Sequence, residues 1–240
     1  YRLAKESGIT SFGIQCMTGS GVLDPNYYPN LISKILKTVK KLKDELNIHM
    51  DYISLGGGYG IPYTDEDSPL NFDNVFNNVA QNFNVFFESR HEAKPALWIE
   101  PGKSVVGDTG ILLTRVTGKK DSYKSYIGVD AGMETLMRPA LYGAYHRIYK
   151  VGDPDALPST KVDITGRICE NTDRLAKDRL FPEVNEGDLL AVMDAGAYGF
   201  TMSNQFCTRP KVAEIFLAGE KPTLIRRRET IKDILRSCDV

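Results

Sequence analysis

The sequence lacks several features that mark large functional classes. No apolar run approaches the roughly 20 residues that span a bilayer, and the first residues do not resemble a signal peptide. The 240 residues include 30 basic and 31 acidic ones, so no excess of one charge favours nucleic acid or an anionic membrane. These absences predict a cytoplasmic protein that binds a small molecule or another protein.

Cysteine and histidine are scarce. The four cysteines are Cys16, Cys169, Cys207 and Cys238. They form no CxxC pair, which favours reduced thiols over a disulfide framework or a zinc site, and no metal site is expected. Three of the four fit ordinary buried cysteines. Among the histidines, His49 and His91 are expected at the surface and His146 in a structural role.

Strands and helices are expected to alternate in the first part of the chain. Strand-like runs lie at 11–16, 50–55 and 96–99, and apolar residues at helical spacing lie at 29–46 and 72–86. This alternation is typical of a parallel α/β sheet. So few units cannot close a (β/α)8 barrel, which needs about 250 residues. The first part is therefore expected to be the end of such a barrel.

From Gly110 onward, short strand-like runs follow one another without intervening helices. They lie at 111–116, 126–129, 161–168, 188–193 and 213–217, and only 229–236 is expected to be helical. The predicted fold class is thus α/β plus all-β, with domains at 1–108 and 109–240. The first is the C-terminal part of a TIM-type barrel, and the second is a β-sandwich or β-barrel domain whose last segment can pack back on the barrel.

A glycine-rich turn follows the second predicted strand and includes Gly56, Gly57 and Gly58. Missing Cβ atoms let backbone N–H groups approach an anion, so the turn suits a phosphate cradle, although a structural turn explains the glycines equally well. It is not a dinucleotide-binding fingerprint, because no helix opens after it.

Glu100 stands at the C-terminal end of the third predicted strand, the edge where barrel enzymes assemble their active sites. A carboxylate there can keep a heterocyclic nitrogen protonated, and Gly102 and Lys103 can add to an anion site. A surface ion pair is the alternative for Glu100.

Four further motifs complete the series. They are Asp130-Ala131-Gly132, the run RPALYGAYH from Arg138 to His146, Cys169-Glu170, and DAGAYG from Asp194 to Gly199. Together these motifs resemble those of the diaminopimelate decarboxylases, a pyridoxal-phosphate-dependent family that pairs a (β/α)8 barrel with a C-terminal β-domain. The resemblance runs from about Phe12 to Leu217. The wider group includes ornithine and arginine decarboxylases.

The resemblance implies a site for pyridoxal 5'-phosphate. The cofactor-binding residues would be Ser20, Gly57, Gly58, Glu100, Gly102, Lys103 and Tyr198. Glu100 would pair with the pyridinium nitrogen, and Tyr198 would contact both cofactor and substrate. The other five would surround the phosphate, Lys103 through its backbone.

The resemblance also implies an amino-acid substrate and a homodimer. Arg138, Tyr142 and Glu170 would hold the substrate's distal end, which suits meso-diaminopimelate and its decarboxylation to L-lysine in lysine biosynthesis. Lys103, standing where the family has arginine, would offer a substrate carboxylate a single point charge. Cys169 would be the general acid beside Glu170, and family members place this cysteine in the active site of the neighbouring subunit.

Some positions depart from the family pattern. Met17 occupies the place of a histidine that stacks on the cofactor ring, and a thioether cannot donate a hydrogen bond. The family's Schiff-base lysine, in a Y-A-x-K-A motif, is absent from these residues. We therefore expect a fragment, or a lysine supplied by a second chain or an upstream segment. Alternative functions are an ornithine- or arginine-type decarboxylase, a non-catalytic homologue and, last, a racemase on the same fold.

Overall fold

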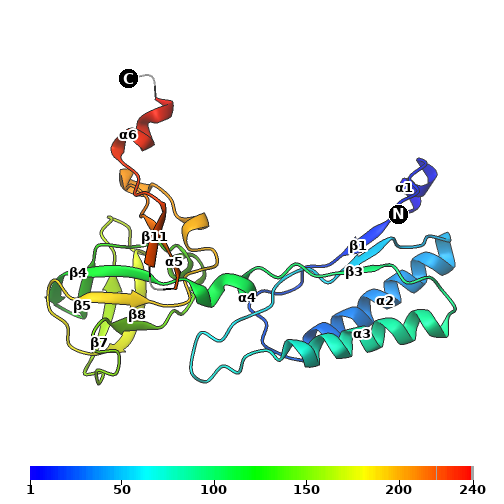
Figure 1. The fold of residues 1–240 in the computed structure, drawn as a ribbon, viewed down its shortest axis with the longest axis horizontal. Coiled ribbons are helices and arrows are strands. Elements are labelled where there is room, and N and C mark those ends of the chain that lie inside the picture. The colour runs from blue at the N-terminus through cyan, green and yellow to red at the C-terminus, as the bar shows by residue number, and fades with distance from the viewer. Residues whose placement is uncertain (220, 239–240) are drawn as a thin grey trace. The chain divides into compact units, whose positions relative to one another are not determined.

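Parallel strands joined by helices build the first unit, Tyr1–Val105, of the computed structural model (Figure 1). Its elements are α1 (Arg2–Glu6), β1 (Gly13–Gln15), α2 (Tyr27–Leu46), β2 (Tyr52–Ser54), α3 (Phe72–Ser89) and β3 (Ala96–Trp98). The sheet has the order β1-β2-β3, and both strand pairs are parallel. The two long helices and the three strands that the sequence predicts are all present. The structure describes residues 1–219 and 221–238.

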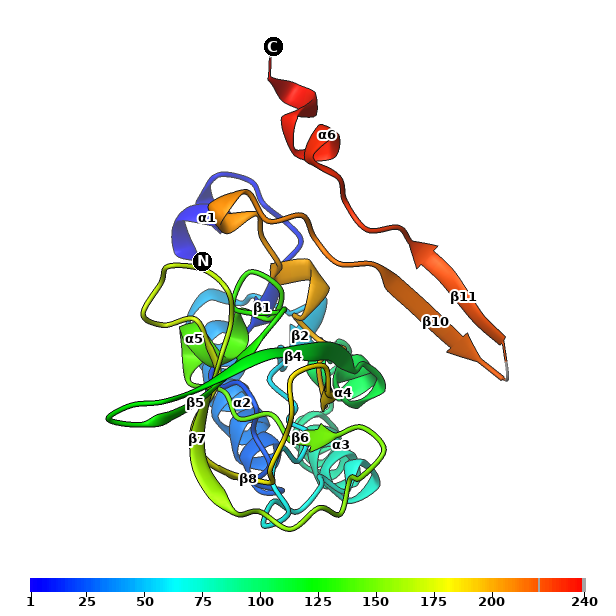
Figure 2. The same cartoon turned by 90° about the vertical axis from the view of Figure 1, so that its left-hand side faces the viewer.

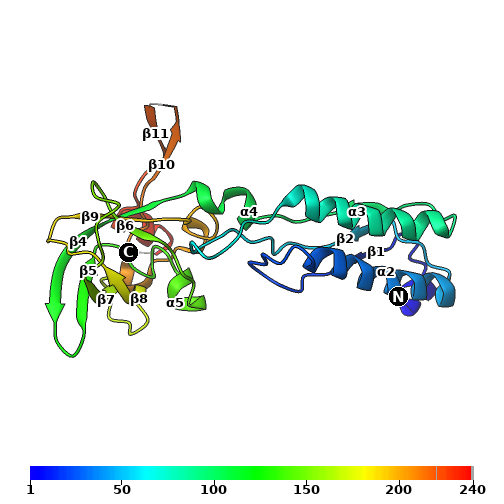
Figure 3. The same ribbon diagram turned by 90° about the horizontal axis from the view of Figure 1, so that it is seen from below.

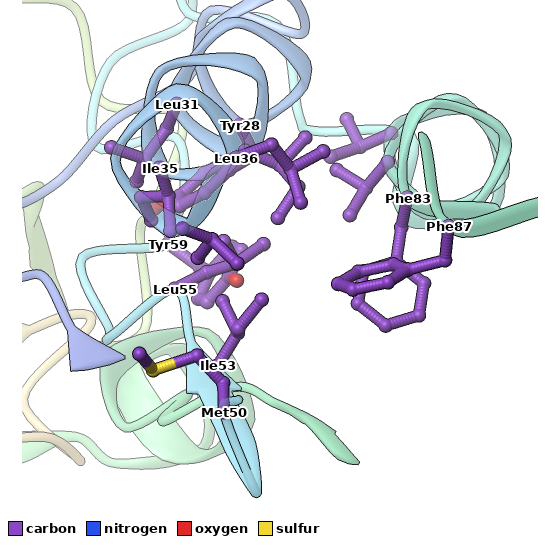
Figure 4. Close-up of a cluster of buried hydrophobic side chains, with 14 of the residues drawn as sticks. Tyr28, Leu31, Ile35, Leu36, Met50, Ile53, Leu55, Tyr59, Phe83 and Phe87 are labelled. Carbon is purple, nitrogen blue, oxygen red and sulfur yellow. The ribbon is translucent and has the colours of Figure 1, made fainter. Parts of the chain in front are cut away.

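An apolar core holds α2 and α3 against the sheet. The two helices pack along each other (Figure 3), and side chains from both meet residues of β2 and the segments beside it (Figure 4). Buried members include Ile32, Ile35 and Leu36 of α2, Val75, Val79 and Phe83 of α3, and Ile53 of β2. Each fully buried side chain of this kind contributes roughly 1.5–3 kcal/mol, so this packing holds the two helices on the sheet.

The second unit, Val106–Val240, is dominated by one mixed sheet. Its strands are β4 (Leu112–Asp121), β5 (Ser125–Val129), β6 (Ile148–Lys150), β7 (Thr160–Thr165), β8 (Arg174–Phe181) and β9 (Leu189–Val192). The order is β6-β9-β4-β5-β7-β8, with β5 and β7 parallel and the other pairs antiparallel. A separate core that includes Val116, Ile164 and Leu190 lies on this sheet.

Short elements fill the connections. They are α4 (Lys103–Val106), η1 (Gly107–Thr109), α5 (Arg138–Tyr142), η2 (Phe200–Met202) and η3 (Phe206–Thr208). The single helix expected at 229–236 is divided into α6 (Ile231–Ile234) and η4 (Leu235–Ser237). It begins later than expected because Thr230 and Asp233 form a capping box.

A second small sheet pairs β10 (Glu214–Ala218) with β11 (Lys221–Arg226), and this hairpin stands away from the six-stranded sheet of the same unit (Figure 2). Its exposed apolar side chains include Ile215, Phe216, Leu217, Leu224 and Ile225. In the described ranges, no helix combines the length and the apolar character that crossing a bilayer requires.

The expectation that three cysteines are buried is wrong. Cys16 is half-buried, and Cys169, Cys207 and Cys238 are exposed, all four as free thiols. The last three lie in connecting segments or near the end of the chain, where neither core reaches them.

Candidate active site

The glycine turn after β2 has a backbone that other residues would strain. Gly56 and Gly58 have φ angles of +66° and +91°, in the region that L side chains rarely adopt. A Cβ on Gly56 would lie 2.2 Å from the carbonyl oxygen of Cys16, and one on Gly58 would lie 2.2 Å from that of Gly19. Glycine is therefore required here by both conformation and close approach.

Two segments are joined through their backbones at this turn. The Val22 N–H donates to the carbonyl of Gly58 at 2.9 Å, and the Gly60 N–H donates to the carbonyl of Val22 at 2.9 Å. The buried hydroxyl of Tyr28 donates to the carbonyl of Gly57 at 3.1 Å. Within residues 1–219 and 221–238, the N–H groups of Gly57 and Gly58 donate to no protein acceptor. The turn thus keeps donors available for an anion.

The Lys103 side chain reaches back to the neighbouring loop, which contains Ser20. Its Nζ lies 3.4 Å from the position that a Cβ on Gly21 would take and 5.7 Å from the centre of the Tyr63 ring. Ser20 itself is exposed. The positive charge of Lys103 therefore lies at the loop that packs on the glycine turn. The N–H donors that an anion needs belong to that same turn.

Glu100 is oriented by the ends of two strands. The Ser54 hydroxyl donates to Oε1 at 2.6 Å, and the Gln15 amide donates to Oε2 at 3.5 Å. The Glu100 backbone N–H donates to the carbonyl of Gly56 at 3.0 Å. These bonds hold the carboxylate beside the glycine turn while the residue stays exposed. A surface ion pair does not describe it, because its side-chain partners are neutral.

The side chain of Met17 lies beside the glycine turn that contains Gly57. Its side chain is exposed, and its sulfur would lie 3.7 Å from a Cβ on Gly57. The thioether thus lies next to the glycine turn. There it can contact an aromatic ring, but it cannot donate a hydrogen bond.

Pyridoxal phosphate fits these residues. Backbone oxygens lie where a Cβ on Gly57 or Gly58 would stand, so only glycine fits at these two positions. The turn that the two glycines form has N–H donors to offer a phosphate. Lys103 supplies a cation, and Glu100 supplies a carboxylate for a ring nitrogen that must carry a proton. The described ranges contain no cluster of three or more potential metal ligands.

In the second unit, Arg138 begins α5 and is almost fully buried. Its Nη1 lies 2.9 Å from Nε2 of His146, whose Nδ1 lies 2.8 Å from the carbonyl oxygen of Met193. Only a neutral imidazole with its proton on Nδ1 satisfies both contacts, donating to Met193 and accepting from Arg138. Burial lowers the pKa of His146, in agreement with a neutral ring.

The loop between β7 and β8 carries Cys169 and Glu170. Thr172 donates to Oε1 of Glu170 from its N–H at 3.1 Å and from its hydroxyl at 3.0 Å. These bonds lower the pKa of Glu170, so its carboxylate is ionised at neutral pH. Cys169 is exposed beside it.

Buried Asp173 holds this loop in place. Its Oδ1 accepts from the Met133 N–H at 2.7 Å, and its Oδ2 accepts from the Ile168 N–H at 3.0 Å. Gly132 and Gly166 make room for it, since a Cβ on either would lie 2.2 or 2.3 Å from the carboxylate. The loop with Cys169 is therefore tied to the segment that leads into α5.

The structure brings some of the expected residues together and leaves others apart. The Cys169 loop is hydrogen-bonded to Met133, which stands five residues before Arg138 in the sequence. Tyr142 and Tyr198 are exposed, and neither forms a side-chain hydrogen bond among the described residues. Gly102 is half-buried next to Lys103. The residues expected to bind the phosphate and the ring nitrogen thus lie in the first unit, and those expected to hold the distal end of the substrate and to donate a proton lie in the second, together with Tyr198.

Sequence reasoning missed the residues that orient the site. Ser54 and Gln15 aim Glu100, His146 supports Arg138, and Asp173 secures the Cys169 loop. A polar residue at the end of a strand, as in Ser54, was a usable signal. The pairing of His146 with Arg138 had no such signal, because it depends on burial.

Known proteins resemble this chain along its length. A family model described as "Pyridoxal-dependent decarboxylase, C-terminal sheet domain" matches residues 22–196. The diaminopimelate decarboxylase of Methanothermobacter thermautotrophicus is 41% identical over 240 residues, which are 100% of this chain and 56% of that protein.

Solved structures agree. The crystal structure of diaminopimelate decarboxylase from M. jannaschii matches with a TM-score of 0.84 at 32% identity, covering 94% of this chain and 51% of that one. Its complex with L-lysine matches with a TM-score of 0.82 at 32% identity, with the same coverage. The chain therefore spans about half the length of the relatives it matches. It belongs to the pyridoxal-dependent decarboxylase family.

Proposed function

We propose that the protein containing this chain decarboxylates meso-diaminopimelate to L-lysine, with pyridoxal phosphate as cofactor. The observation that carries the proposal is that Asp173 bonds the loop of the ionised Glu170 to Met133, five residues before the buried Arg138 in the sequence. The distal end of meso-diaminopimelate bears a carboxylate and an ammonium group, which match a guanidinium and a carboxylate respectively. Tyr142 adds a phenol at the end of α5.

The first unit would bind the cofactor, which when bound supplies an electron sink for loss of carbon dioxide. Ser20, Gly57, Gly58 and Gly102 hold the phosphate with backbone and hydroxyl donors. Lys103 stands beside the phosphate, with Nζ 3.4 Å from the Cβ position of Gly21, and offers a substrate carboxylate a single point charge. Glu100, held by Ser54, keeps a proton on the ring nitrogen.

The second unit would handle the substrate and the proton. The Cys169 thiol delivers its proton to the substrate α-carbon after carbon dioxide leaves. Glu170 holds the distal ammonium group and stays ionised because Thr172 donates two hydrogen bonds to it. Tyr198 contacts cofactor and substrate through an exposed phenol that no neighbour in the described ranges engages.

We further propose the architecture that this activity requires. Residues 1–108 form the C-terminal part of a (β/α)8 barrel, and 109–240 form a β-sandwich or β-barrel domain. The active enzyme is a cytoplasmic homodimer with active sites at the subunit interface, to which one subunit contributes Cys169. The parallel order β1-β2-β3 supports the barrel assignment, since barrel strands are all parallel.

The test is a product assay on the full-length protein with pyridoxal phosphate. Incubation with meso-diaminopimelate is expected to release carbon dioxide and L-lysine in equal amounts. A Cys169→Ala variant should lose at least about a hundredfold in turnover, the usual range for removing a positioned acid. Cys238→Ala, which changes an exposed cysteine outside the proposed site, is the matched control and should keep normal turnover.

Other outcomes separate the alternatives. Turnover of ornithine or arginine with none of diaminopimelate would overturn the substrate while leaving the reaction class. Cofactor binding without turnover of any amino acid would favour a non-catalytic homologue.

A further inference from the structure

A buried carboxylate of the second unit has no part in the proposed chemistry. Glu134 lies between β5 and α5 and is 2% exposed. The Arg167 guanidinium donates from Nε to its Oε1 at 3.0 Å, whereas Oε2 has no hydrogen-bond partner in the part of the chain that the structure describes. Loss of one partner of a buried ion pair is strongly destabilising, because the other charge is left uncompensated. Glu134 therefore depends on Arg167.

A second buried carboxylate increases this dependence. A Cβ on Gly132 would lie 2.2 Å from Oδ1 of Asp173 and 2.7 Å from Oε2 of Glu134, so both carboxylates crowd one glycine. Asp173 is 3% exposed and accepts hydrogen bonds from neutral backbone N–H groups. Like charges repel most strongly where water is excluded. The guanidinium of Arg167 offsets part of this repulsion.

The loop between β7 and β8 is thereby anchored on both sides of Cys169. Arg167, two residues before the cysteine, bonds to Glu134, and its carbonyl accepts from Arg209 at 3.5 Å. Asp173, four residues after the cysteine, accepts at 2.7 Å from a backbone N–H of the segment between β5 and α5. Glu134 belongs to that same segment. The loop therefore keeps its place on the segment only while both anchors hold.

The two anchors lie next to different side chains. Glu170 adjoins the second anchor: Thr172 donates two hydrogen bonds to its carboxylate, and the Asp173 N–H donates to its carbonyl at 3.0 Å. Cys169 adjoins the first anchor, since only one residue separates it from Arg167. Breaking the first anchor should therefore displace the thiol more than the Glu170 carboxylate.

We propose that Glu134 and Arg167 are a positioning pair for Cys169. The inference rests on the proposed function, in which the Cys169 thiol delivers its proton to the substrate α-carbon. A misplacement of about 1 Å can cost roughly a hundredfold in rate, so loss of either partner lowers kcat. The distal ammonium group of the substrate is held by Glu170, which keeps its own hydrogen bonds, so KM changes little.

Steady-state kinetics on the full-length protein with pyridoxal phosphate test the pair. Glu134→Gln and Arg167→Gln should each lower kcat for meso-diaminopimelate at least about tenfold, with KM within about twofold of wild type. The double variant should lose no more than the worse single variant, because residues that act as a unit are not additive. Arg167→Lys keeps a positive charge beside the buried carboxylate, which protects folding, and should recover part of the lost kcat.

Lys124→Gln is the matched control. Lys124 is a half-buried cation 3.6 Å from the buried carboxylate of Asp163, and it lies between β4 and β5. Its removal breaks an ion pair of the same kind in the same unit, away from the Cys169 loop. We expect a lower midpoint of urea unfolding with normal kcat, which is the pattern of an ion pair that only stabilises the fold.

Alkylation of Cys169 by iodoacetamide, resolved by site with mass spectrometry, reports on the loop without turnover. Glu134→Gln and Arg167→Gln should react faster than wild type, because a loop that has lost an anchor opens more often. Lys124→Gln should react at the wild-type rate.

Three results would overturn the proposal. They are single variants whose kcat falls no more than that of Lys124→Gln, a raised KM with unchanged kcat, or a double variant whose loss is the product of the two single losses. Failure of the proposed function is distinguishable. If the wild-type protein releases no lysine, that function is wrong, and the alkylation rates still decide whether the pair positions Cys169: faster reaction in both single variants supports it, and equal rates overturn it.

Discussion

At the scale of single residues, Arg138 is a cation almost without solvent contact, and the ring of His146 is one of the groups that keep it there. A buried guanidinium needs acceptors, and an unpaired one would cost several kcal/mol, about the penalty of an uncompensated buried charge. Neutral His146 provides an acceptor at Nε2 and uses its other nitrogen on Met193. Protonation of His146 would remove that acceptor and place two cations side by side.

This arrangement predicts a pH-dependent stability. Burial lowers the pKa of His146 from 6.5 in the folded state, so the unfolded chain takes up this proton at higher pH than the folded one. The contribution of His146 to the free energy of unfolding is complete above pH 6.5. It falls as the pH drops below that value, by up to about 1.4 kcal/mol per pH unit. In His146→Gln, we expect a smaller loss between neutral and acidic pH in urea unfolding. His49→Gln, at an exposed histidine, should retain the wild-type slope; equal slopes for all three proteins would contradict this account.

Met17 allows a second test at the residue scale. A methionine sulfur in contact with the cofactor ring would contribute about 0.3–1.5 kcal/mol to the free energy of binding. A stacked imidazole in its place would contribute about 0.5–1.5 kcal/mol. Met17→His should therefore strengthen binding of pyridoxal phosphate by less than about tenfold, measured as Kd by fluorescence titration. Thr18→His, at the exposed neighbour, controls for added imidazole. A loss of affinity in Met17→His would show that the cradle is shaped around the thioether.

At the scale of elements, the glycine turn depends on two segments that are distant in sequence and joined by backbone hydrogen bonds. The turn follows β2, and its partner loop follows β1, so the parallel pairing of these strands brings them to one edge of the sheet. The buried ring of Tyr28, stacked on Tyr59 at 4.1 Å, supports the turn from α2. The helix, both strands and both loops therefore have to fold together.

A single methyl group should disrupt this turn. In Gly58→Ala, the positive φ alone costs about 1–3 kcal/mol, and the new Cβ would lie 2.2 Å from the Gly19 carbonyl oxygen. We expect lower unfolding free energy and at least tenfold weaker cofactor binding. Gly118→Ala is the matched control, because nothing lies within 4 Å of its Cβ position, and it should change stability by about 0.5 kcal/mol or less. Normal cofactor affinity in Gly58→Ala would remove the turn from the phosphate site.

At the scale of the whole molecule, the proposed homodimer predicts complementation between variants. Glu100→Ala and Cys169→Ala should each be nearly inactive alone. If one subunit supplies Cys169 to the site of its partner, a mixed dimer has one site with both residues intact. Random mixing makes half of the dimers mixed, so about a quarter of wild-type activity should return. Turnover measured after mixing and subunit exchange checks this, and no recovery despite proven exchange would place both residues on one subunit.

The sequence by itself determined the two long helices, the strands between them and the change to short strands after Gly110. Periodic apolar residues carry that information locally, which explains why α2 and α3 match their predicted ranges closely. It missed β8, where charged residues such as Arg174, Lys177 and Asp178 obscure the alternation. Burial of that strand depends on pairing with β7, which lies earlier in the chain.

The candidate site divides in the same way. Motifs alone identified the glycine turn, Glu100, Arg138 and Cys169, because the chemistry needs those residue types. Only the tertiary structure decided that Lys103 turns toward Gly21, that His146 faces Arg138, and that Asp173 secures the Cys169 loop. Such pairs join residues from different elements. Their distance and burial are set by packing and by backbone hydrogen bonds between loops, and no local pattern in the sequence records either.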